Sequence, residues 1–212
     1  MNLPHEYSKN SRIQASKSGH KFSETPKVDI QRSSFDRSHG FKTTFDGGYL
    51  VPILVDEALP GDTFSVNMTA FARLATPIYP IMDNMYMTTH FFSVPYRLVW
   101  DHWKNFMGER RPNPDSSIDY TIPVMDVTQA PLSTTGYLNE SLSDYMTIPT
   151  LIPALEHNSL HHRAYNLIYN EWFRDENLQD SVTVDTGDGP DDPADYVLLR
   201  RGKRHDYFTS SL

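Results

Sequence analysis

The chain has 212 residues and no cysteine. This length is enough for one domain with a buried core, and the lack of cysteine excludes disulfide bonds, thiolate metal sites and cysteine nucleophiles. Aromatic residues make up 12% of the chain and 15 residues are proline, which favours a β-rich fold whose prolines lie in long ordered loops.

Charge is distributed unevenly along the chain. Residues 1–45 carry eight Lys or Arg and four Asp or Glu, whereas residues 46–212 carry eleven and twenty-three. The two segments should therefore prefer different surroundings. The sequence contains no run of 18 apolar residues, and its first residues lack the apolar region of a signal peptide. We therefore expect synthesis in the cytoplasm without membrane insertion.

Residues 1–40 are polar and rich in serine, and their few apolar side chains follow neither a helical nor a strand period. Such a segment cannot bury enough apolar area to offset its chain entropy. We interpret it as an extended basic N-terminal arm that is either disordered or bound along another subunit. A tail without a role is the alternative.

Several later segments have the pattern of strands. The apolar run 49–55 contains a proline and should be an edge strand or an extended connection. Residues 63–73 alternate between apolar and polar side chains, which predicts a half-buried strand. Residues 84–94 predict a second strand, and shorter ones are expected at 120–127 and 196–199. So few strands leave unpaired edges, and we expect partner strands from outside the chain.

Two helices are predicted, separated by the proline-rich and irregular residues 109–153. Val99, Trp103 and Phe106 have helical spacing, and Gly108 is suitably placed to end a short amphipathic helix. A longer helix is expected to begin near Pro153 and to end near Asp175. Its predicted apolar stripe consists of Leu160, Ala164, Leu167, Ile168 and Trp172.

The sequence offers no nucleotide-binding motif and no catalytic serine, histidine and aspartate pattern. His157 and His161 are four residues apart on the predicted helix, as in zinc-binding helices, but the other residues of a metalloprotease motif are missing. We therefore favour structural roles for these residues and for His162. The prediction is a protein without enzyme activity, cofactor or metal.

Five aspartates cluster near the end of the chain. Clustered carboxylates can bind hard cations, but the spacing here is not that of an EF-hand loop. We favour a solvated hairpin loop over an exposed ion site. The five are Asp185, Asp188, Asp191, Asp192 and Asp195.

Two basic groups could contact nucleic acid, one in the leader and one near residue 200. Both could neutralise phosphates, and the aromatic residues near them, Phe22, Phe35, Tyr207 and Phe208, could stack on unpaired bases. Ordinary solvated charge and salt bridges to a neighbouring subunit are the alternatives. For the leader, nucleic acid and a neighbouring subunit are equally favoured. The candidate contacts are Lys9, Arg12, Lys17, Lys21, Arg200, Arg201, Lys203 and Arg204.

Several strings in this sequence, taken in order, resemble the major capsid protein of the Microviridae, and most of all its gokushovirus branch of single-stranded DNA phages. The match is dense from about residue 35 to 110 and returns over 166–175 and 203–212. The strings are FKTTFDGGYLVPI at 41–53, DEALPGDTF at 56–64, ARLATP at 72–77, PIMDN at 80–84, FSVPYRLVWD at 92–101 and KRHDYFTSSL at 203–212.

The resemblance implies a mainly β fold: an eight-stranded antiparallel viral jelly roll, incomplete in this chain, with long loop insertions and one or two helices. Residues 1–40 would be the arm. Residues 41–212 would be the N-terminal portion of the capsid domain, with insertions at about 109–195. Family members are much longer than this chain.

The resemblance also implies a structural function and several partners. Copies of the capsid protein would form pentamers and then a closed icosahedral T=1 shell around circular single-stranded DNA. A small basic internal protein could share the DNA binding. The protein would be made in the cytoplasm of a bacterial host and be located in the virion. A jelly-roll module that binds glycans or a metal is the alternative function.

Overall fold

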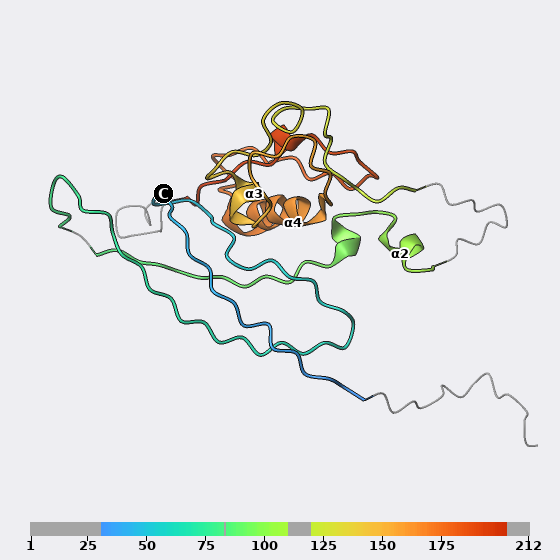
Figure 1. Cartoon of the computed structure of the whole chain (residues 1–212), viewed down its shortest axis with the longest axis horizontal. Helices are drawn as coiled ribbons and strands as arrows, with labels where there is room; N and C mark the ends of the chain where they lie inside the picture. Colours follow the sequence, from blue (N-terminus) through green and yellow to red (C-terminus); the bar gives the residue numbers. More distant parts are fainter. Residues whose placement is uncertain (1–30, 83, 110–119, 203–212) are drawn as a thin grey trace, which may run out of the picture. The chain divides into compact units, whose positions relative to one another are not determined.

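The computed structural model describes residues 31–82, 84–109 and 120–202. The chain divides into two units, Met1–Gly40 and Phe41–Leu212. Residues 31–40, the described part of the first unit, lack regular secondary structure and are exposed. Within the described residues, all helices and all buried side chains belong to the second unit (Figure 1).

Residues 41–95 of the second unit form a long extended stretch without a helix (Figure 1). Every described residue from 54 to 93 is exposed. The predicted half-buried strand at 63–73 is therefore wrong about burial: Phe64 and Val66 are 51% and 52% exposed. In the described part of the chain, no backbone hydrogen bond joins residues 63–82 to another segment. The apolar face of this stretch thus has no sheet beneath it.

The expected eight-stranded jelly roll, and a mainly β fold in general, is wrong for this structure. The described residues form no sheet. Alternation of side chains produces a strand only where a neighbour supplies backbone hydrogen bonds, and residues 63–82 have no such neighbour within the described chain. The alternative function as a jelly-roll binding module loses its scaffold for the same reason. The isolated bridges present pair Tyr49 with Arg200, Val124 with Asn158 and Met125 with Asp191.

The first helical region consists of two short turns, η1 (Tyr96–Leu98) and α2 (Trp103–Phe106). The predicted amphipathic helix is thus present only as separate turns. Gly108 has a φ of 96°, a left-handed conformation that suits glycine after a helix end. Val99 and Trp100 lie between the turns and are buried against Leu160, so this region contributes one part of the core.

A second part of the core forms around α3 (Leu142–Tyr145). The helix begins after Ser141, whose side-chain oxygen accepts a hydrogen bond from the Asp144 backbone N–H at 3.2 Å, as an N-cap residue does. The predicted strand at 120–127 is reduced to the bridge positions Val124 and Met125. The buried residues of this cluster are Met125, Leu132, Tyr137, Leu142, Met146 and Tyr196.

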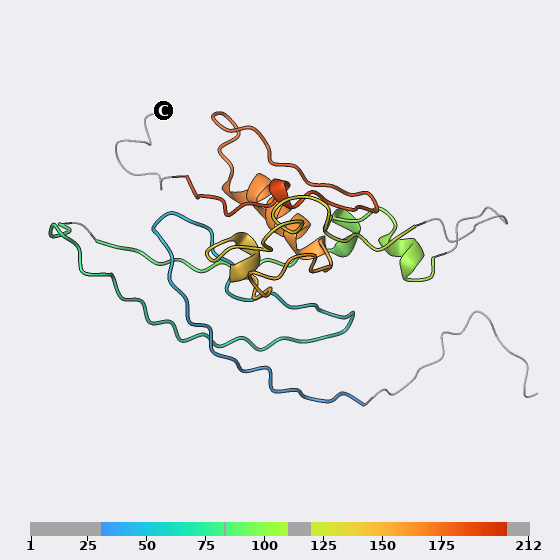
Figure 2. The same ribbon diagram turned by 45° about the horizontal axis from the view of Figure 1, so that its top comes forward.

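The longest helical stretch is α4 (Leu160–Ile168), which continues directly into the π-helical turn η2 (Tyr169–Phe173). The loops that precede and follow α4 in sequence, including the short turn η3 (Pro193–Asp195), lie beside the helix in both views (Figures 1 and 2). None of the helices in the described residues is long and apolar enough to cross a membrane.

The predicted helix from Pro153 begins later than expected, at Leu160. The residues expected to form its first turns are not helical: Pro153 and Ala154 form a turn, and residues 157–159 pair with the segment at 123–125. The His157 carbonyl accepts from the Met125 N–H at 3.0 Å, and the Ser159 N–H donates to a carbonyl of the same segment at 3.2 Å. His157 therefore lies outside the helix, and its predicted helical spacing with His161 is wrong.

Gly136 occupies a position that no other residue should tolerate. Its φ is 77°, and a Cβ atom there would overlap the backbone of Ile152. We expect Gly136→Ala to lower the free energy of unfolding by at least about 1–2 kcal/mol, the usual cost of a left-handed alanine, with the overlap adding to it. Urea denaturation would measure the change. Gly47→Ala is the matched control, because Gly47 has open space around it, and an equal loss in both variants would contradict the prediction.

Candidate functional site

The structure describes two of the eight candidate nucleic-acid contacts, Arg200 and Arg201, and both are exposed. Lys9, Arg12, Lys17, Lys21, Lys203 and Arg204 lie outside the described residues.

Backbone pairing places the two arginines. The Leu50 N–H donates to the Leu199 carbonyl at 2.9 Å, and the Arg201 N–H donates to the Gly48 carbonyl at 2.8 Å. Tyr49 and Arg200 form the antiparallel bridge between these bonds. Because successive side chains of extended backbone point to opposite sides, Arg200 and Arg201 are directed to different surroundings.

Arg200 lies over the ring of Tyr49. Its guanidinium carbon is 4.4 Å from the ring centroid, and its Nη2 donates to the Tyr49 hydroxyl at 2.9 Å. A cation over an aromatic face is attracted by the ring quadrupole. Arg200 is therefore held at the bridge by Tyr49, which carries no negative charge to compensate that of the guanidinium.

Arg201 lies beside a group of aromatic rings that sequence reasoning did not single out. We define the aromatic cluster as His90, Phe92, Trp172 and Phe173. The Arg201 guanidinium carbon is 5.9 Å from the Phe173 centroid. Within the described residues, no carboxylate lies within ion-pair distance of Arg200 or Arg201.

The rings of the aromatic cluster contact one another mainly edge to face. Phe92 meets Trp172 at a centroid distance of 5.9 Å and Phe173 at 5.8 Å, with interplanar angles of 70° and 75°. His90 meets Phe173 at 5.4 Å. Such pairs stabilise one another beyond the area they bury. Trp172 is nevertheless 66% exposed, so it did not join the predicted apolar stripe inside the core.

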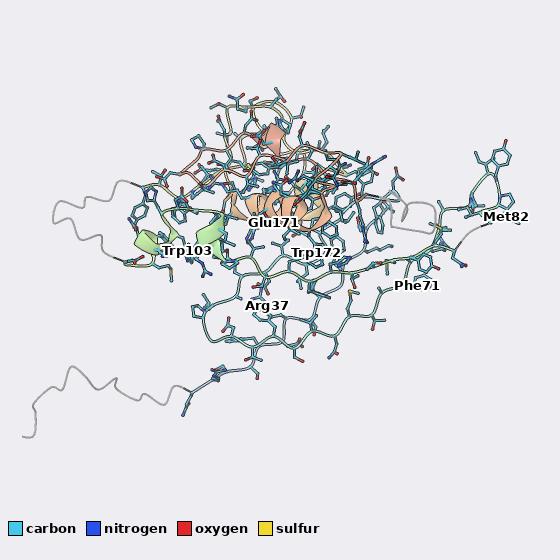
Figure 3. The ribbon with its side chains drawn as sticks, turned by 180° about the vertical axis from the view of Figure 1, so that it is seen from behind. Arg37, Phe71, Met82, Trp103, Glu171 and Trp172 are labelled. Carbon is cyan, nitrogen blue, oxygen red and sulfur yellow. The ribbon has the colours of Figure 1, made fainter. Side chains whose placement is uncertain are left out.

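The π-helical turn η2, which directly follows α4, contains both Trp172 and Phe173, and Figure 3 shows Trp172 at this end of the helix. The Arg174 N–H closes the turn by donating to the Tyr169 carbonyl at 2.8 Å. The side chain of Asn170 holds it in place, because it both donates to the Val182 carbonyl and accepts from the Val182 N–H, at 2.8 and 2.9 Å. The turn that carries the two rings is thus tied by hydrogen bonds to another segment.

Arg163 of α4 and Asp191 of the acidic loop form a buried ion pair. Arg163 Nε donates to Oδ2 at 2.7 Å and Nη2 donates to Oδ1 at 2.5 Å, and the two side chains are 0% and 1% exposed. Nη1 donates to the carbonyls of Val99 and Gly187 at 2.9 and 2.8 Å. Tyr196 adds a hydrogen bond from its hydroxyl to Asp191 Oδ2 at 2.7 Å.

This ion pair keeps both side chains charged. Burial alone would raise the pKa of Asp191, but hydrogen bonds from Arg163 and Tyr196 lower it below its ordinary value. A bridge to Met125 fixes the position of Asp191, since its N–H donates to the Val124 carbonyl at 2.9 Å. The pair therefore joins α4 to three loops and explains why a polar face of the helix is buried.

The histidines near α4 have structural contacts. His162 is fully buried, and a 3.0 Å hydrogen bond joins its Nε2 to the Ser143 hydroxyl. Burial lowers the pKa of His162 from 6.5 to about 3. His157 donates from Nδ1 to the Asn158 carbonyl and accepts from the Tyr137 hydroxyl at 2.8 Å, and burial lowers its pKa as well. The two rings are 5.4 Å apart.

The acidic loop at 185–195 is less solvated than predicted. Asp191 is buried, and Asp188 Oδ1 accepts hydrogen bonds from Trp100 Nε1 and His102 Nδ1, both at 2.8 Å. Asp192 caps η3 by accepting from the Ala194 N–H at 2.9 Å. The carboxylates are thus used as acceptors within the fold. Among the described residues, no group of three or more His, Asp or Glu side chains is arranged to hold a metal ion.

Comparison with known proteins decides the family. The model of the family described as capsid protein (F protein) matches residues 23–212. The chain belongs to this capsid-protein family. The resemblance to the capsid protein of the Microviridae is confirmed.

Three capsid proteins illustrate the relationship. Capsid protein VP1 of Bdellovibrio phage phiMH2K is 51% identical over 193 residues, that of Chlamydia phage 1 is 48% identical over 212 residues, and that of Spiroplasma virus 4 is 34% identical over 205 residues. Each match covers 91% of this chain. The chain spans 35% of the length of the first two relatives and 36% of the third.

Proposed function

We propose that this chain is part of a major capsid protein that associates into pentamers and a small icosahedral shell and encloses a circular single-stranded DNA genome. Membership of the capsid-protein family supports the structural role. Closed symmetry stabilises such shells because each subunit satisfies several modest interfaces at once. The virion would be its location.

The observation that carries this proposal is the exposed stretch 54–93. If each large apolar side chain there exposes roughly 100 Å², the total is on the order of 1,500 Å², above the ~800 Å² that each partner buries in a typical protein interface. Exposed apolar area of this size marks an interaction surface. The side chains are Leu54, Val55, Leu59, Phe64, Val66, Met68, Phe71, Leu74, Ile78, Tyr79, Ile81, Met82, Met85, Tyr86, Met87, Phe91 and Phe92.

The most exposed part of this stretch lies around residues 71–82. Ile78 and Met82 are 93% and 94% exposed, and Figure 3 shows Phe71 and Met82 on the part of the chain that leads away from the helices. We propose that other polypeptide of the assembled capsid covers these side chains.

An assembly experiment tests the proposal. Replacing Ile78 and Met82 together by aspartate should reduce the yield of particles by about tenfold or more, because charges would be buried without partners. Negative-stain electron microscopy and sedimentation velocity measure the yield. Asn67→Asp, a charge at an exposed polar position of the same stretch, is the control. Regular shells formed equally by the double variant would contradict the proposal.

The basic residues complete the proposal. The leader residues Lys9, Arg12, Lys17 and Lys21 and the group Arg200, Arg201, Lys203 and Arg204 are proposed to contact the genome through phosphate neutralisation. A small basic internal protein is proposed as a further partner. Particles purified by sedimentation should contain circular single-stranded DNA that survives nuclease treatment. Particles of the wild-type protein that never contain DNA would contradict genome enclosure while leaving assembly intact.

A further inference from the structure

We propose that the aromatic cluster and Arg201 together bind unpaired bases of single-stranded DNA. This inference rests on the proposed enclosure of a DNA genome and assigns one contact surface to it. Base stacking on aromatic side chains next to basic residues is the usual way in which proteins bind single strands without sequence preference.

The exposure of Trp172 gives the surface its stacking platform. Two-thirds of this side chain is accessible, although Phe92 contacts it edge to face at 5.9 Å. Phe92 in turn contacts Phe173, and His90 contacts both phenylalanines. The indole therefore has a ring contact on one side, from Phe92, while much of it remains available. A rigid, pre-oriented ring binds a base at a lower entropic cost than a mobile one.

The position of Arg201 supplies the charge that a nucleotide needs. Its guanidinium lies 5.9 Å from the Phe173 ring, and within the described residues it has no carboxylate partner. We expect a base stacked on Trp172 to place its phosphate near Arg201, because Arg201 lies beside Phe173 and both Trp172 and Phe173 contact Phe92.

The composition of the surface distinguishes it from the proposed protein contact at 71–82. That contact is formed largely by aliphatic side chains such as Ile78, Ile81 and Met82, which suit an apolar protein partner. The aromatic cluster instead combines flat rings with an arginine, the combination typical of single-strand binding. We therefore assign nucleic acid to the cluster and protein to residues 71–82.

Tryptophan fluorescence and a binding titration test the assignment. The full chain is titrated with a short oligodeoxythymidine, and the affinity is followed as a function of salt. Trp172→Ala should weaken binding by about tenfold or more, as expected for the loss of one stacked base. Trp172→Phe, which keeps a ring, should stay within a few-fold of the wild type. Arg201→Gln should reduce the slope of log affinity against log salt by about 0.7.

Tyr79→Ala is the matched control, because Tyr79 is 81% exposed but lies in the stretch assigned to protein contact. Its affinity for the oligonucleotide should equal that of the wild type. Thermal unfolding of each variant checks that the core is intact, which is expected because Trp172 is largely outside it.

The outcomes separate the two proposals. Wild-type binding that is unchanged in a folded Trp172→Ala variant overturns the assigned surface alone. A Trp172→Ala variant that loses particles but keeps its oligonucleotide affinity also overturns it and makes the cluster a protein contact. A wild-type chain that binds no single-stranded DNA at all also overturns the assigned surface, whereas genome enclosure is tested separately by the DNA content of the particles.

Discussion

Replacing Asp191 with alanine should lower the free energy of unfolding by about 3–5 kcal/mol. The substitution removes the carboxylate that accepts two hydrogen bonds from the buried Arg163 guanidinium. It leaves the guanidinium with the carbonyls of Val99 and Gly187 and with the half-exposed Asp185 carboxylate at 3.9 Å. Removing one partner of a buried pair costs more than the pair contributes, because the remaining charge stays out of water. Urea denaturation followed by tryptophan fluorescence would measure the loss, since Trp100 is buried close to Val99.

Two further variants test the reason for this loss. Asp185→Asn removes a carboxylate that is 3.9 Å from Arg163 but 47% exposed. This substitution should lower the free energy of unfolding by less than about 1 kcal/mol. Replacing both partners, Arg163→Met with Asp191→Leu, should cost less than Asp191→Ala alone, because no unpaired charge remains. A double variant as unstable as the sum of its parts would contradict the ion-pair argument.

Mild acid should weaken the fold through His162. Its pKa is about 3 in the folded chain and 6.5 ordinarily, so below pH 6.5 the unfolded chain binds a proton that the folded chain does not. The free energy of unfolding should therefore fall as pH falls, by up to about 1.4 kcal/mol per pH unit, until pH approaches 3. His157, whose pKa is also lowered by burial, acts in the same direction.

Asp191 adds to this acid sensitivity only at lower pH. Its folded pKa lies below the ordinary 3.8, so its contribution is complete above that value and is lost as pH falls further. Urea denaturation at pH 7.5, 5.5 and 4.5 therefore isolates the histidines. His162→Gln should flatten the dependence in this range. His161→Gln is the control, because the His161 side chain is 34% exposed on the same helix, and this variant should keep the steep pH dependence of the wild type. A wild-type free energy of unfolding that does not change over this pH range would contradict the prediction.

Local features of the chain were predictable from sequence. Gly108 ends the first helical region as its position suggested, and α4 with η2 ends near the predicted residue 175. The segment 49–55 is an extended connection, one of the two forms expected for it. The strand predicted at 196–199 is wrong, because these residues only lead to the isolated bridge of Arg200 with Tyr49. These features depend on glycine, proline and the spacing of apolar residues, which act over a few positions.

The burial of polar side chains of α4 could not be predicted from the same patterns. Arg163, His162 and Asn166 are completely buried, although a charged or polar residue within a helical pattern usually faces solvent. Their burial depends on partners far away in sequence, such as Asp191 and the carbonyls of Thr183 and Asp195 that accept from Asn166 Nδ2. Asn166 and Asn170 are four residues apart and so lie on one side of the helical stretch, where both bond backbone groups of the segment 182–195.

The errors in the β prediction have a related physical cause. Residues 63–73 alternate as a strand should, but alternation says only that the segment would suit a half-buried sheet. A sheet needs backbone partners, and within the described chain residues 63–82 have none. The prediction of where α4 starts was wrong for the opposite reason: a backbone partner was present that the sequence pattern did not reveal. His157 and Ser159 pair with the 123–125 segment instead of forming the helical turns that local propensity allowed.

Synthesis order should govern how this coat protein folds. The hydroxyls of Tyr145 and Tyr165 donate to the carbonyls of Thr44 and Leu50, which are 101 and 115 residues earlier in the chain. Tyr165 also accepts from the Leu199 N–H at 3.0 Å. The early segment therefore leaves the ribosome on the order of ten seconds before its anchoring tyrosines at typical translation rates. During that interval the apolar stretch 54–93 is a ready target for chaperones, and slowing translation between residues 95 and 165 should increase aggregation of the nascent chain.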